Sequence, residues 1–388
     1  MTTAVIIDAV RTASGRGKPG GQFSALHPVD LLATVLRGLV DRNGLDPELI
    51  DDVIGGCLSQ IGEQSVNITR NAVLAAGFPE SVPGTTVDRQ CGSSQQAATF
   101  AAQGVIAGAY DVVIACGVEL MSKNPINAAT LGRDPWGPRL AARYPGGLIG
   151  QGISAELIAA RWNLERVELD EYAARSHRLA TTAAASGSFA REILAVDGRT
   201  VDETVRPGTS PEKLAALPAA FFDEGLAARF PEIGWRITAG NSSPLTDGAS
   251  AVLIMSEERA TSLGLVPRAR FRASAVVGSD PLEMLTGVIP VTRRILERTG
   301  MVMDDIDTFE VNEAFASVPL AWQRELHADP DRVNPRGGAI ALGHALGSSG
   351  TRLLTTMLGT LEQTGGRFGL QVMCEGGGMA NASLIERI

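Results

Sequence analysis

The chain has 388 residues, of which 44% are hydrophobic and 20% charged, and its formal net charge is −9 at pH 7. This length exceeds what one small hydrophobic core serves, so two or three domains are expected. An acidic chain neutralises few phosphates, which excludes broad nucleic-acid binding, and no apolar run reaches the ~18 residues of a membrane span. Any anionic ligand must therefore meet a local basic site.

The few cysteines and histidines exclude further classes of site. The four cysteines are scattered without paired spacing, at Cys57, Cys91, Cys116 and Cys374. That spacing favours a reducing compartment and argues against a disulfide framework or a zinc cluster. The N-terminus MTTAVIIDAVRT enters a strand-like run without the regions of a signal peptide. We expect a cytoplasmic protein with no metal site and no membrane partner.

The first third of the chain reads as an α/β domain. Short apolar runs alternate with alanine-rich amphipathic segments, as in a largely buried sheet. The predicted strands are AVIIDAV, DDVIGGCL, GTTVDRQC and DVVIACGVE. Between about 121 and 240 the chain becomes rich in Pro, Gly and Arg around one polar helix expected over 169–187. This segment is interpreted as an inserted, loop-rich subdomain.

A second alternating series begins at RARFRASAVVG and runs to the C-terminus. Both series contain an Ile-Asp step into an apolar strand, at 50–51 and at 306–307. Both also have a late strand that ends in Cys and then Gly, at 116–117 and at 374–376. An internal duplication into two similar α/β halves is the economical interpretation, and chance similarity between buried strands is the alternative.

Cys91 is the first candidate for chemistry. It follows the strand expected at 85–87, and Gly-Ser-Ser then opens an alanine-rich helix. At a helix N-terminus the macrodipole and free N–H groups favour a thiolate and can hold an oxyanion. The alternative is a buried, inert cysteine. The polar neighbours Asp88 and Arg89 favour a nucleophile.

His344 lies in the glycine-rich segment NPRGGAIALGHALGSSG. A histidine in such a loop can approach a substrate closely and act near neutral pH as a base or hydrogen-bond donor. The alternative is a loop histidine that only bonds the backbone. The other three histidines, His27, His177 and His327, stand in more polar settings and are expected to be solvated.

Two strand ends carry the remaining candidates. Cys374 ends the apolar run LQVM before a glycine turn, the position at which α/β sheets expose catalytic groups. The alternative is a core cysteine like Cys116. Asn312 and Glu313 follow the strand TFEV, where a helix cap is the alternative. Two cysteines and one histidine in such settings suggest a nucleophile, a base and a second acid.

Four sequence blocks resemble the signature blocks of the thiolases, and together they span most of the chain. They are CGSSQQA, NEAFA, NPRGGAIALGHALG and CEGGGMA, in this order. The resemblance implies the thiolase α/β fold: two duplicated βαβαβαββ core domains in an αβαβα layered arrangement with an inserted loop domain. It implies an N-terminal core at 1–120 plus 241–268, a CoA-binding loop domain at 121–240 and a C-terminal core at 269–388.

The same resemblance assigns roles to the candidates. Cys91 would attack the 3-keto carbon of a 3-ketoacyl-CoA and become acylated as acetyl-CoA leaves, and a second CoA thiol would take the acyl group. His344 would accept the Cys91 proton and donate to the thioester oxygen, while Asn312 would position a water in that oxyanion hole. Cys374 would protonate the acetyl-CoA carbanion. The N–H groups of Cys91 and Gly376 would form a second oxyanion hole.

Contacts to CoA are implied in the loop domain. Arg206 would lie near the CoA phosphates, and Phe221 and Ser243 would contact its adenine and pantetheine portions. A solvated Arg206 and a core-packed Phe221 are the alternatives. CoA would be a co-substrate, with no permanently bound cofactor, and the family resemblance implies a homodimer or homotetramer.

Two residues depart from the family pattern. Ala345 stands where proline usually follows the histidine, which removes one fixed φ angle beside His344. Glu375 stands where many members carry an apolar residue, and its charge is expected to raise the pKa of Cys374. Neither change removes a functional group.

The function expected from these residues is a degradative 3-ketoacyl-CoA thiolase acting in fatty-acid or sterol-type β-oxidation. The first alternative is an acetyl-CoA acetyltransferase that acts on the four-carbon substrate. A non-catalytic acyl-CoA carrier would not need all four of Cys91, Asn312, His344 and Cys374. A condensing enzyme of the ketoacyl synthase kind would carry a second histidine where this chain has Cys374.

Overall fold

The computed structural model describes residues 2–388, whose strands form one eleven-stranded sheet. Its order is β4-β3-β5-β7-β1-β8-β11-β10-β9, with the short strands β2 and β6 paired to β7 and β1. The strands are β1 (Ala4–Thr12), β2 (Gly15–Arg16), β3 (Asp52–Gly56), β4 (Thr85–Val87), β5 (Val112–Leu120), β6 (Ile193–Leu194), β7 (Thr246–Ser256), β8 (Ala269–Gly278), β9 (Thr308–Val311), β10 (Phe368–Glu375) and β11 (Met379–Arg387).

Helices connect these strands and cover the sheet. They are α1 (Pro28–Arg42), α2 (Ile68–Ala75), α3 (Ser93–Ile106), α4 (Gly137–Arg143), α5 (Gln151–Arg161), α6 (Arg166–Ala185), α7 (Pro211–Ala215), α8 (Glu224–Arg229), α9 (Glu257–Ser262), α10 (Val288–Thr299), α11 (Ser317–Leu326), α12 (Ala339–Leu342) and α13 (Ser349–Thr364). Short 3₁₀ turns lie at Pro47–Leu49, Gly62–Gln64, Ala128–Thr130, Met284–Gly287, Met303–Asp305 and Pro330–Arg332.

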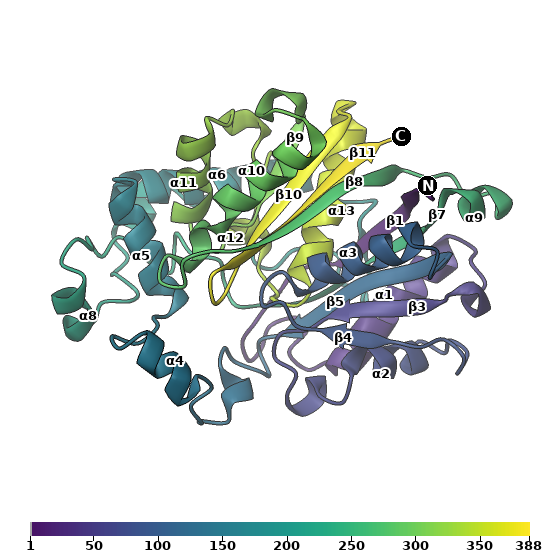
Figure 1. Cartoon of the computed structure of the whole chain (residues 1–388), viewed down its shortest axis with the longest axis horizontal. Coiled ribbons are helices and arrows are strands. Elements are labelled where there is room, and N and C mark those ends of the chain that lie inside the picture. Colours follow the sequence, from purple (N-terminus) through teal and green to yellow (C-terminus); the bar gives the residue numbers. More distant parts are fainter. Residues whose placement is uncertain (1) are drawn as a thin grey trace.

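The elements stack in five layers. Helices α3 and α13 pack on each other between the two halves of the sheet (Figure 1). Helices α1 and α2 cover the outer face of the half that contains β5, and α10 covers the outer face of the half that contains β8 and β11. The halves join where Val5 and Ile6 of β1 pair with Arg270 and Ala269 of β8. This α-β-α-β-α stacking confirms the expected layered fold.

The four strands expected in the first third of the chain are all present, as β1, β3, β4 and β5. Every residue of β1, β5 and β7 is buried. Strands covered by helices on both faces read as continuous apolar runs instead of alternating ones. That continuity made these strands recognisable in the sequence.

The two halves repeat one pairing pattern. In the first, β3 pairs with β5 in parallel and β5 with β7 antiparallel; in the second, β9 pairs with β10 in parallel and β10 with β11 antiparallel. Oδ2 of Asp51 accepts hydrogen bonds from the N–H groups of residues 111 and 112 at 2.6 and 2.9 Å. Oδ2 of Asp307 does the same for residues 367 and 368 at 2.7 and 2.8 Å. The repeated Ile-Asp step therefore fixes the start of the neighbouring parallel strand in each half.

The segment between β5 and β7 contains helices α4 to α8 and extends from one side of the layered core (Figure 1). The helix expected over 169–187 is α6. The expectation that His177 on this helix is solvated is wrong, because its side chain is 1% exposed. It is covered by Arg206 from the same inserted segment. The domain boundaries at 120, 240 and 268 stay a prediction.

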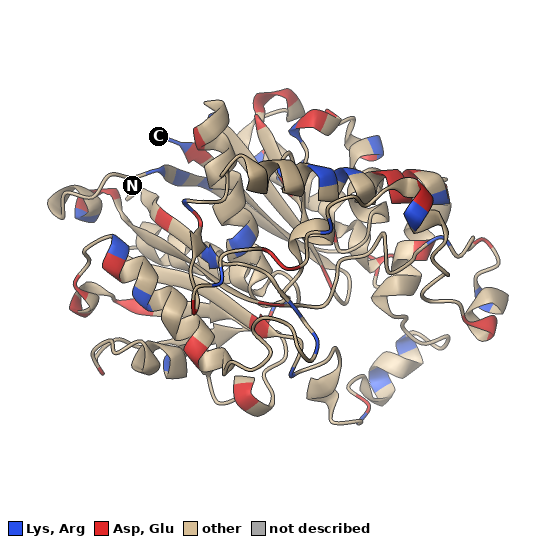
Figure 2. Cartoon of the chain, turned by 180° about the vertical axis from the view of Figure 1, so that it is seen from behind, with Lys and Arg blue, Asp and Glu red and all other residues tan. Residues whose placement is uncertain are grey.

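Charged residues are spread over the outer helices and loops, whereas the interior strands are largely neutral (Figure 2). Among residues 2–388, no helix combines the length and the apolar character needed to cross a membrane. The same residues contain no group of three His, Cys, Asp or Glu side chains placed to hold a metal ion.

Candidate active site

Cys91 lies in the turn between β4 and α3, with Gly92 as the N-cap residue of α3. Its side chain is buried, and Nε2 of Gln151 lies 3.9 Å from its Sγ. The backbone N–H groups of Cys91 itself and of Gly376 also hydrogen-bond the sulfur and lower its pKa. The two N–H groups expected to form an oxyanion hole therefore converge on the Cys91 thiol.

The helix N-terminus does not by itself make Cys91 a thiolate. Burial raises the pKa of the Cys91 thiol to about 12, more than the hydrogen bonds from Gln151 and the backbone lower it. The sequence suggested the opposite, because a helix N-terminus favours a thiolate when the sulfur keeps some contact with water. Cys91 is therefore a neutral thiol that needs a base.

His344 lies in the loop between α12 and α13, and its position is fixed from two sides. Its backbone N–H donates to Oγ1 of Thr246 at 2.9 Å, and its Nδ1 lies 2.6 Å from Oγ of Ser349. The Ser349 hydroxyl donates its own proton to the carbonyl of Ala345 at 2.8 Å. Nδ1 must therefore carry a proton and donate to Ser349, which leaves Nε2 of His344 as the acceptor.

The unprotonated Nε2 of His344 faces Asn312. Burial first, and the charge of Arg352 second, lower the pKa of His344 to about 3, so the imidazole is neutral. Nδ2 of Asn312 lies 3.4 Å from Nε2 of His344 and 4.0 Å from Sγ of Cys374. Asn312 thus links the histidine with the second cysteine. It is not a helix cap, because α11 begins only at Ser317.

Cys374 lies near the end of β10 and is completely buried. Burial raises the pKa of its thiol, and the next largest cause is the charge that Cys91 would carry as a thiolate. The two sulfurs are therefore close enough for the protonation of one to affect the other. The charge of an ionised Glu375 is the smallest of the causes that raise this pKa, so it ranks below burial.

Glu313 holds the site to the inserted segment, a role that the sequence did not indicate. Its carboxylate accepts hydrogen bonds from the Tyr172 hydroxyl at 3.0 Å and the Ser176 hydroxyl at 2.7 Å, both on α6. It also accepts from Nδ2 of Asn334 at 2.9 Å and from the N–H of Ile340 at 3.0 Å. The residue after Asn312 thereby joins α6 to the loop that leads to His344.

Glu119 at the end of β5 holds the other side of the His344 loop. It accepts hydrogen bonds from the N–H groups of Leu58 at 2.9 Å and Gly347 at 3.0 Å, and from the side chain of Gln64 at 2.7 Å. The sequence contained one sign of this role, which is a glutamate inside the apolar run VVIACGVEL. A carboxyl group buried in such a strand needs several hydrogen-bond partners.

Phe221 and Ser243 lie beside the segment that follows Asn312. The ring of Phe221 meets that of Phe315 edge to face with 5.9 Å between centroids. It also covers Gly152 of α5, where a Cβ atom would lie 2.4 Å from the ring. The N–H of Ser243 donates to the carbonyl of Ala314 at 3.0 Å. Phe221 is only partly buried, so part of its ring stays exposed on the surface.

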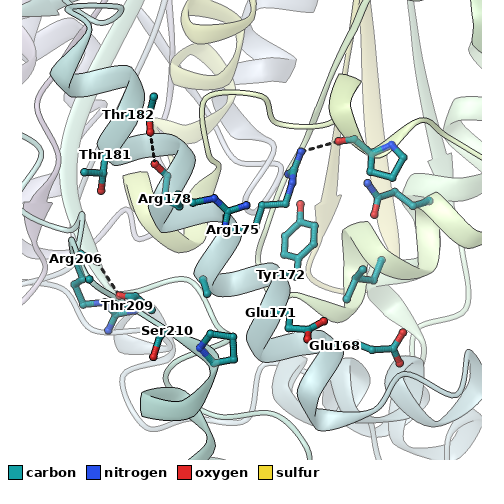
Figure 3. Close-up of a pocket in the computed structure, with 16 residues that line it drawn as sticks. Glu168, Glu171, Tyr172, Arg175, Arg178, Thr181, Thr182, Arg206, Thr209 and Ser210 are labelled. Carbon is teal, nitrogen blue, oxygen red and sulfur yellow. Dashed lines mark hydrogen bonds between the residues drawn. The ribbon is translucent and has the colours of Figure 1, made fainter.

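Arg206 lies in a separate pocket of about 850 Å³ between α6, the start of α7 and α11 (Figure 3). Arg175 and Arg178 of α6 line the same pocket, and Glu168 and Glu171 line its other end. Within residues 2–388, none of these three arginines forms an ion pair with a carboxylate, whereas Glu168 pairs with Arg324. The three arginines therefore gather positive charge at one end of this pocket.

The close contacts between Arg206 and His177 cannot all be hydrogen bonds. The backbone N–H of Arg206 points at Nδ1 of His177, and its Nε and Nη2 lie 3.2 and 3.0 Å from Nε2. Burial lowers the pKa of His177 to about 4, so the imidazole is neutral and has a single acceptor nitrogen. It cannot accept at both nitrogens, so only one of these two sets of contacts is a hydrogen bond to His177.

Two family models match the chain. The one described as the thiolase N-terminal domain matches residues 4–258, and the one described as the thiolase C-terminal domain matches residues 265–387. These two matches together cover nearly every residue from β1 to β11.

Named relatives and a solved structure cover the same length. The chain is 49% identical to the steroid 3-ketoacyl-CoA thiolase FadA6 of Mycobacterium tuberculosis, over 100% of this chain and 95% of that protein. It is 44% identical to a 3-ketoacyl-CoA thiolase of Yersinia pestis, over the full length of both. It matches the crystal structure of the Bacillus anthracis acetyl-CoA acetyltransferase with a TM-score of 0.88 and 37% identity, over 100% of this chain and 99% of that one.

Proposed function

This chain belongs to the thiolase family of acyltransferases, and from that premise we propose that it cleaves 3-ketoacyl-CoA with CoA through an acyl-enzyme at Cys91. The observation that carries the proposal is the convergence of distant segments on one buried site. Asn312 Nδ2 lies within 4.0 Å of both His344 Nε2 and Cys374 Sγ, and the protonation of Cys374 depends on Cys91.

The first step is proton transfer from Cys91 to Nε2 of His344. The high pKa of the buried thiol means that the thiolate forms only as the sulfur bonds to the 3-keto carbon. The negative charge then moves to the former keto oxygen, which the N–H groups of Cys91 and Gly376 stabilise. Preorganised donors of this kind contribute about 3 kcal/mol each to the transition state.

The second step breaks the bond between carbons 2 and 3. Its electron pair moves to carbon 2 of the departing acetyl-CoA, whose thioester oxygen receives hydrogen bonds from protonated His344 and from a water held by Asn312. Cys374 donates its proton to carbon 2, and its own thiolate remains. A second CoA gives its thiol proton to this base, and its sulfur attacks the Cys91 thioester. The shortened acyl-CoA is released, and the Cys91 thiolate takes its proton back from Nε2 of His344, which restores the Cys91 thiol and the neutral imidazole.

CoA enters this reaction as a co-substrate, and we propose that its phosphates bind in the pocket of Arg206. The three arginines of this pocket have no carboxylate partner among residues 2–388, and phosphate oxygens accept the paired donors of a guanidinium. Phe221 and Ser243 lie beside the segment that follows Asn312, which suits contacts to the adenine and pantetheine portions of CoA.

We favour a degradative thiolase over an acetyl-CoA acetyltransferase. The relatives named as 3-ketoacyl-CoA thiolases are 49% and 44% identical to this chain, and the solved acetyltransferase is 37% identical. The test is the CoA-dependent loss of 3-ketoacyl-CoA absorbance across substrates from four carbons to bulky, ring-bearing acyl chains. Activity confined to the four-carbon substrate would favour the acetyltransferase.

The nucleophile is tested by Cys91→Ala. We expect it to abolish both thiolysis and the acyl-enzyme that mass spectrometry detects after mixing with 3-ketoacyl-CoA. Cys116→Ala is the matched control, because Cys116 is equally buried in β5 but faces the core. Near-native turnover by Cys91→Ala would rule out the mechanism.

We also propose a cytoplasmic homodimer or homotetramer. Strand β4 is at the edge of the sheet and has one unpaired side, which a second copy can cover. Light scattering of the purified chain measures the assembly directly, and a monomer at micromolar concentration would contradict it.

A further inference from the structure

Glu375 is a completely buried carboxyl group for which the reaction above has no use. It is the last residue of β10 and is 0% exposed. Within the described part of the chain, neither of its oxygens has a hydrogen-bond partner. A buried carboxylate without partners loses hydration that nothing replaces, so such a group keeps its proton. Burial accordingly raises the pKa of Glu375 to about 8.

The Glu375 carboxyl packs against the backbone immediately after Cys91. A Cβ atom on Gly92 would lie 2.1 Å from Oε1 of Glu375 and 2.9 Å from Nδ2 of Asn381. Nδ2 of Asn381 also donates to the Gly92 carbonyl at 3.1 Å. Residue 92 must therefore be glycine for the carboxyl group to fit under the turn that presents the nucleophile.

The charged groups around Glu375 come from this same turn and from β10. The positive charge of Arg89 lowers its pKa and the negative charge of Asp88 raises it, both by less than burial does. In the other direction, an ionised Glu375 raises the pKa values of Cys91 and Cys374. Arg89 forms no ion pair with Glu375 that would cancel this effect among residues 2–388.

We propose that Glu375 is kept as a neutral acid beneath the Cys91 turn and that its charge, once formed in alkaline solution, opposes the Cys91 thiolate. Glu375 is a positioning residue, since it acts through Cys91 and touches no reacting atom. The enzyme then works while Glu375 is protonated and loses rate as this carboxyl ionises. This inference rests on the proposed role of Cys91 as the nucleophile.

The experiment compares wild type with Glu375→Gln, which keeps the shape and removes the ionisation. The readout is the rate of Cys91 alkylation by iodoacetamide from about pH 6 to pH 10, with the modified residue identified by mass spectrometry. We expect equal rates at the acid end and faster alkylation of the variant at the alkaline end, by up to about tenfold, the effect of one unit of thiol pKa. The alkaline decline of kcat/KM should disappear as well.

Glu310→Gln is the matched control. Glu310 is also completely buried with two unpartnered oxygens, but its charged neighbours are Arg352, Glu313, Arg336 and Glu192 and do not include Cys91. It should leave the Cys91 alkylation profile unchanged. A Glu375→Gln profile that coincides with wild type would overturn the proposal.

A second pair of variants covers the case in which Glu375→Gln folds poorly. Arg89→Gln removes the positive charge that favours ionised Glu375, so the alkaline decline of kcat/KM should move to higher pH. Arg89→Lys keeps the positive charge and should cause no such shift, and an equal shift in both variants contradicts the proposal. Failure of Cys91 as the nucleophile is recognised separately, by an active Cys91→Ala variant.

Discussion

The side-chain amide of Asn312 points at Nε2 of His344 across 3.4 Å, and its other polar atom, Oδ1, is buried without a partner in the described chain. An unsatisfied acceptor inside a closed site is one that a bound water can complete. Asn312 and His344 therefore form a complete set of hydrogen-bond donors only when substrate and a water bind beside them.

Replacing Asn312 with Ala should lower kcat by about 10²–10³, because one oxyanion-stabilising donor is lost. The stability of the fold should change little, since Oδ1 makes no hydrogen bond in the described chain and the contacts of Nδ2 are long, at 3.4 and 4.0 Å. Steady-state kinetics and thermal unfolding of the same preparation separate the two effects. A variant that loses stability and activity together would assign Asn312 a structural role.

Ser349→Ala should weaken the base. Without the Ser349 hydroxyl, Nδ1 of His344 loses the acceptor that keeps the proton on that nitrogen, and kcat should fall between about tenfold and a hundredfold. Ser348→Ala is the control, because the Ser348 hydroxyl lies 2.8 Å from that of Ser250 instead. Equal losses from both variants would contradict the tautomer assigned to His344.

Arg206→Ala should raise the KM for CoA by about tenfold, equivalent to 1.4 kcal/mol, and leave kcat almost unchanged. The KM should also depend less on ionic strength, because a charge that attracts phosphate is gone. Arg298→Ala on α10 removes a charge that hydrogen-bonds Ser274 and should change neither quantity. An unaltered KM would place the CoA phosphates elsewhere.

Glu310 makes the stability depend on pH. Burial raises the pKa of Glu310 from 4.5 to about 8, so between these values the folded state binds more protons than the unfolded state. Stability is therefore complete below about pH 4.5 and falls as the pH rises to about 8, by a few kcal/mol at most. Glu310→Gln should flatten this slope in urea unfolding, and Glu257→Gln on the exposed start of α9 should not. Parallel slopes for wild type and Glu310→Gln would contradict the prediction.

The sequence was informative where one local signal decides the structure. Continuous apolar runs identified β1 and β5. The repeated Ile-Asp step indicated the duplication, and Asp51 and Asp307 make equivalent hydrogen bonds in the two halves. The apolar run before a glycine turn predicted a strand end at Cys374, and this residue lies near the end of β10. Each strand, Ile-Asp step and turn that gives these signals is short and local in the sequence, and the duplication follows from comparing two such local signals.

Features that depend on distant partners could not be predicted. The periodicity of α6 places His177 on a polar face of the helix. It does not reveal that Arg206 covers this face. Glu313 resembled a helix cap, because Tyr172 and Ser176 are far away in the sequence. The pKa of Cys91 was expected to be low because the sequence shows a helix N-terminus but not the loss of water around the sulfur.

The burial of Cys91 is completed only late in the synthesis of the chain. The backbone N–H of Gly376 hydrogen-bonds the sulfur of Cys91. The ribosome adds Gly376 to the chain 285 residues after Cys91. At ordinary rates of translation this takes on the order of tens of seconds. During that interval the thiol lacks the cover of β10 and has the reactivity of any exposed cysteine toward oxidants and electrophiles. Formation of the C-terminal strands is therefore the step that removes the Cys91 thiol from water.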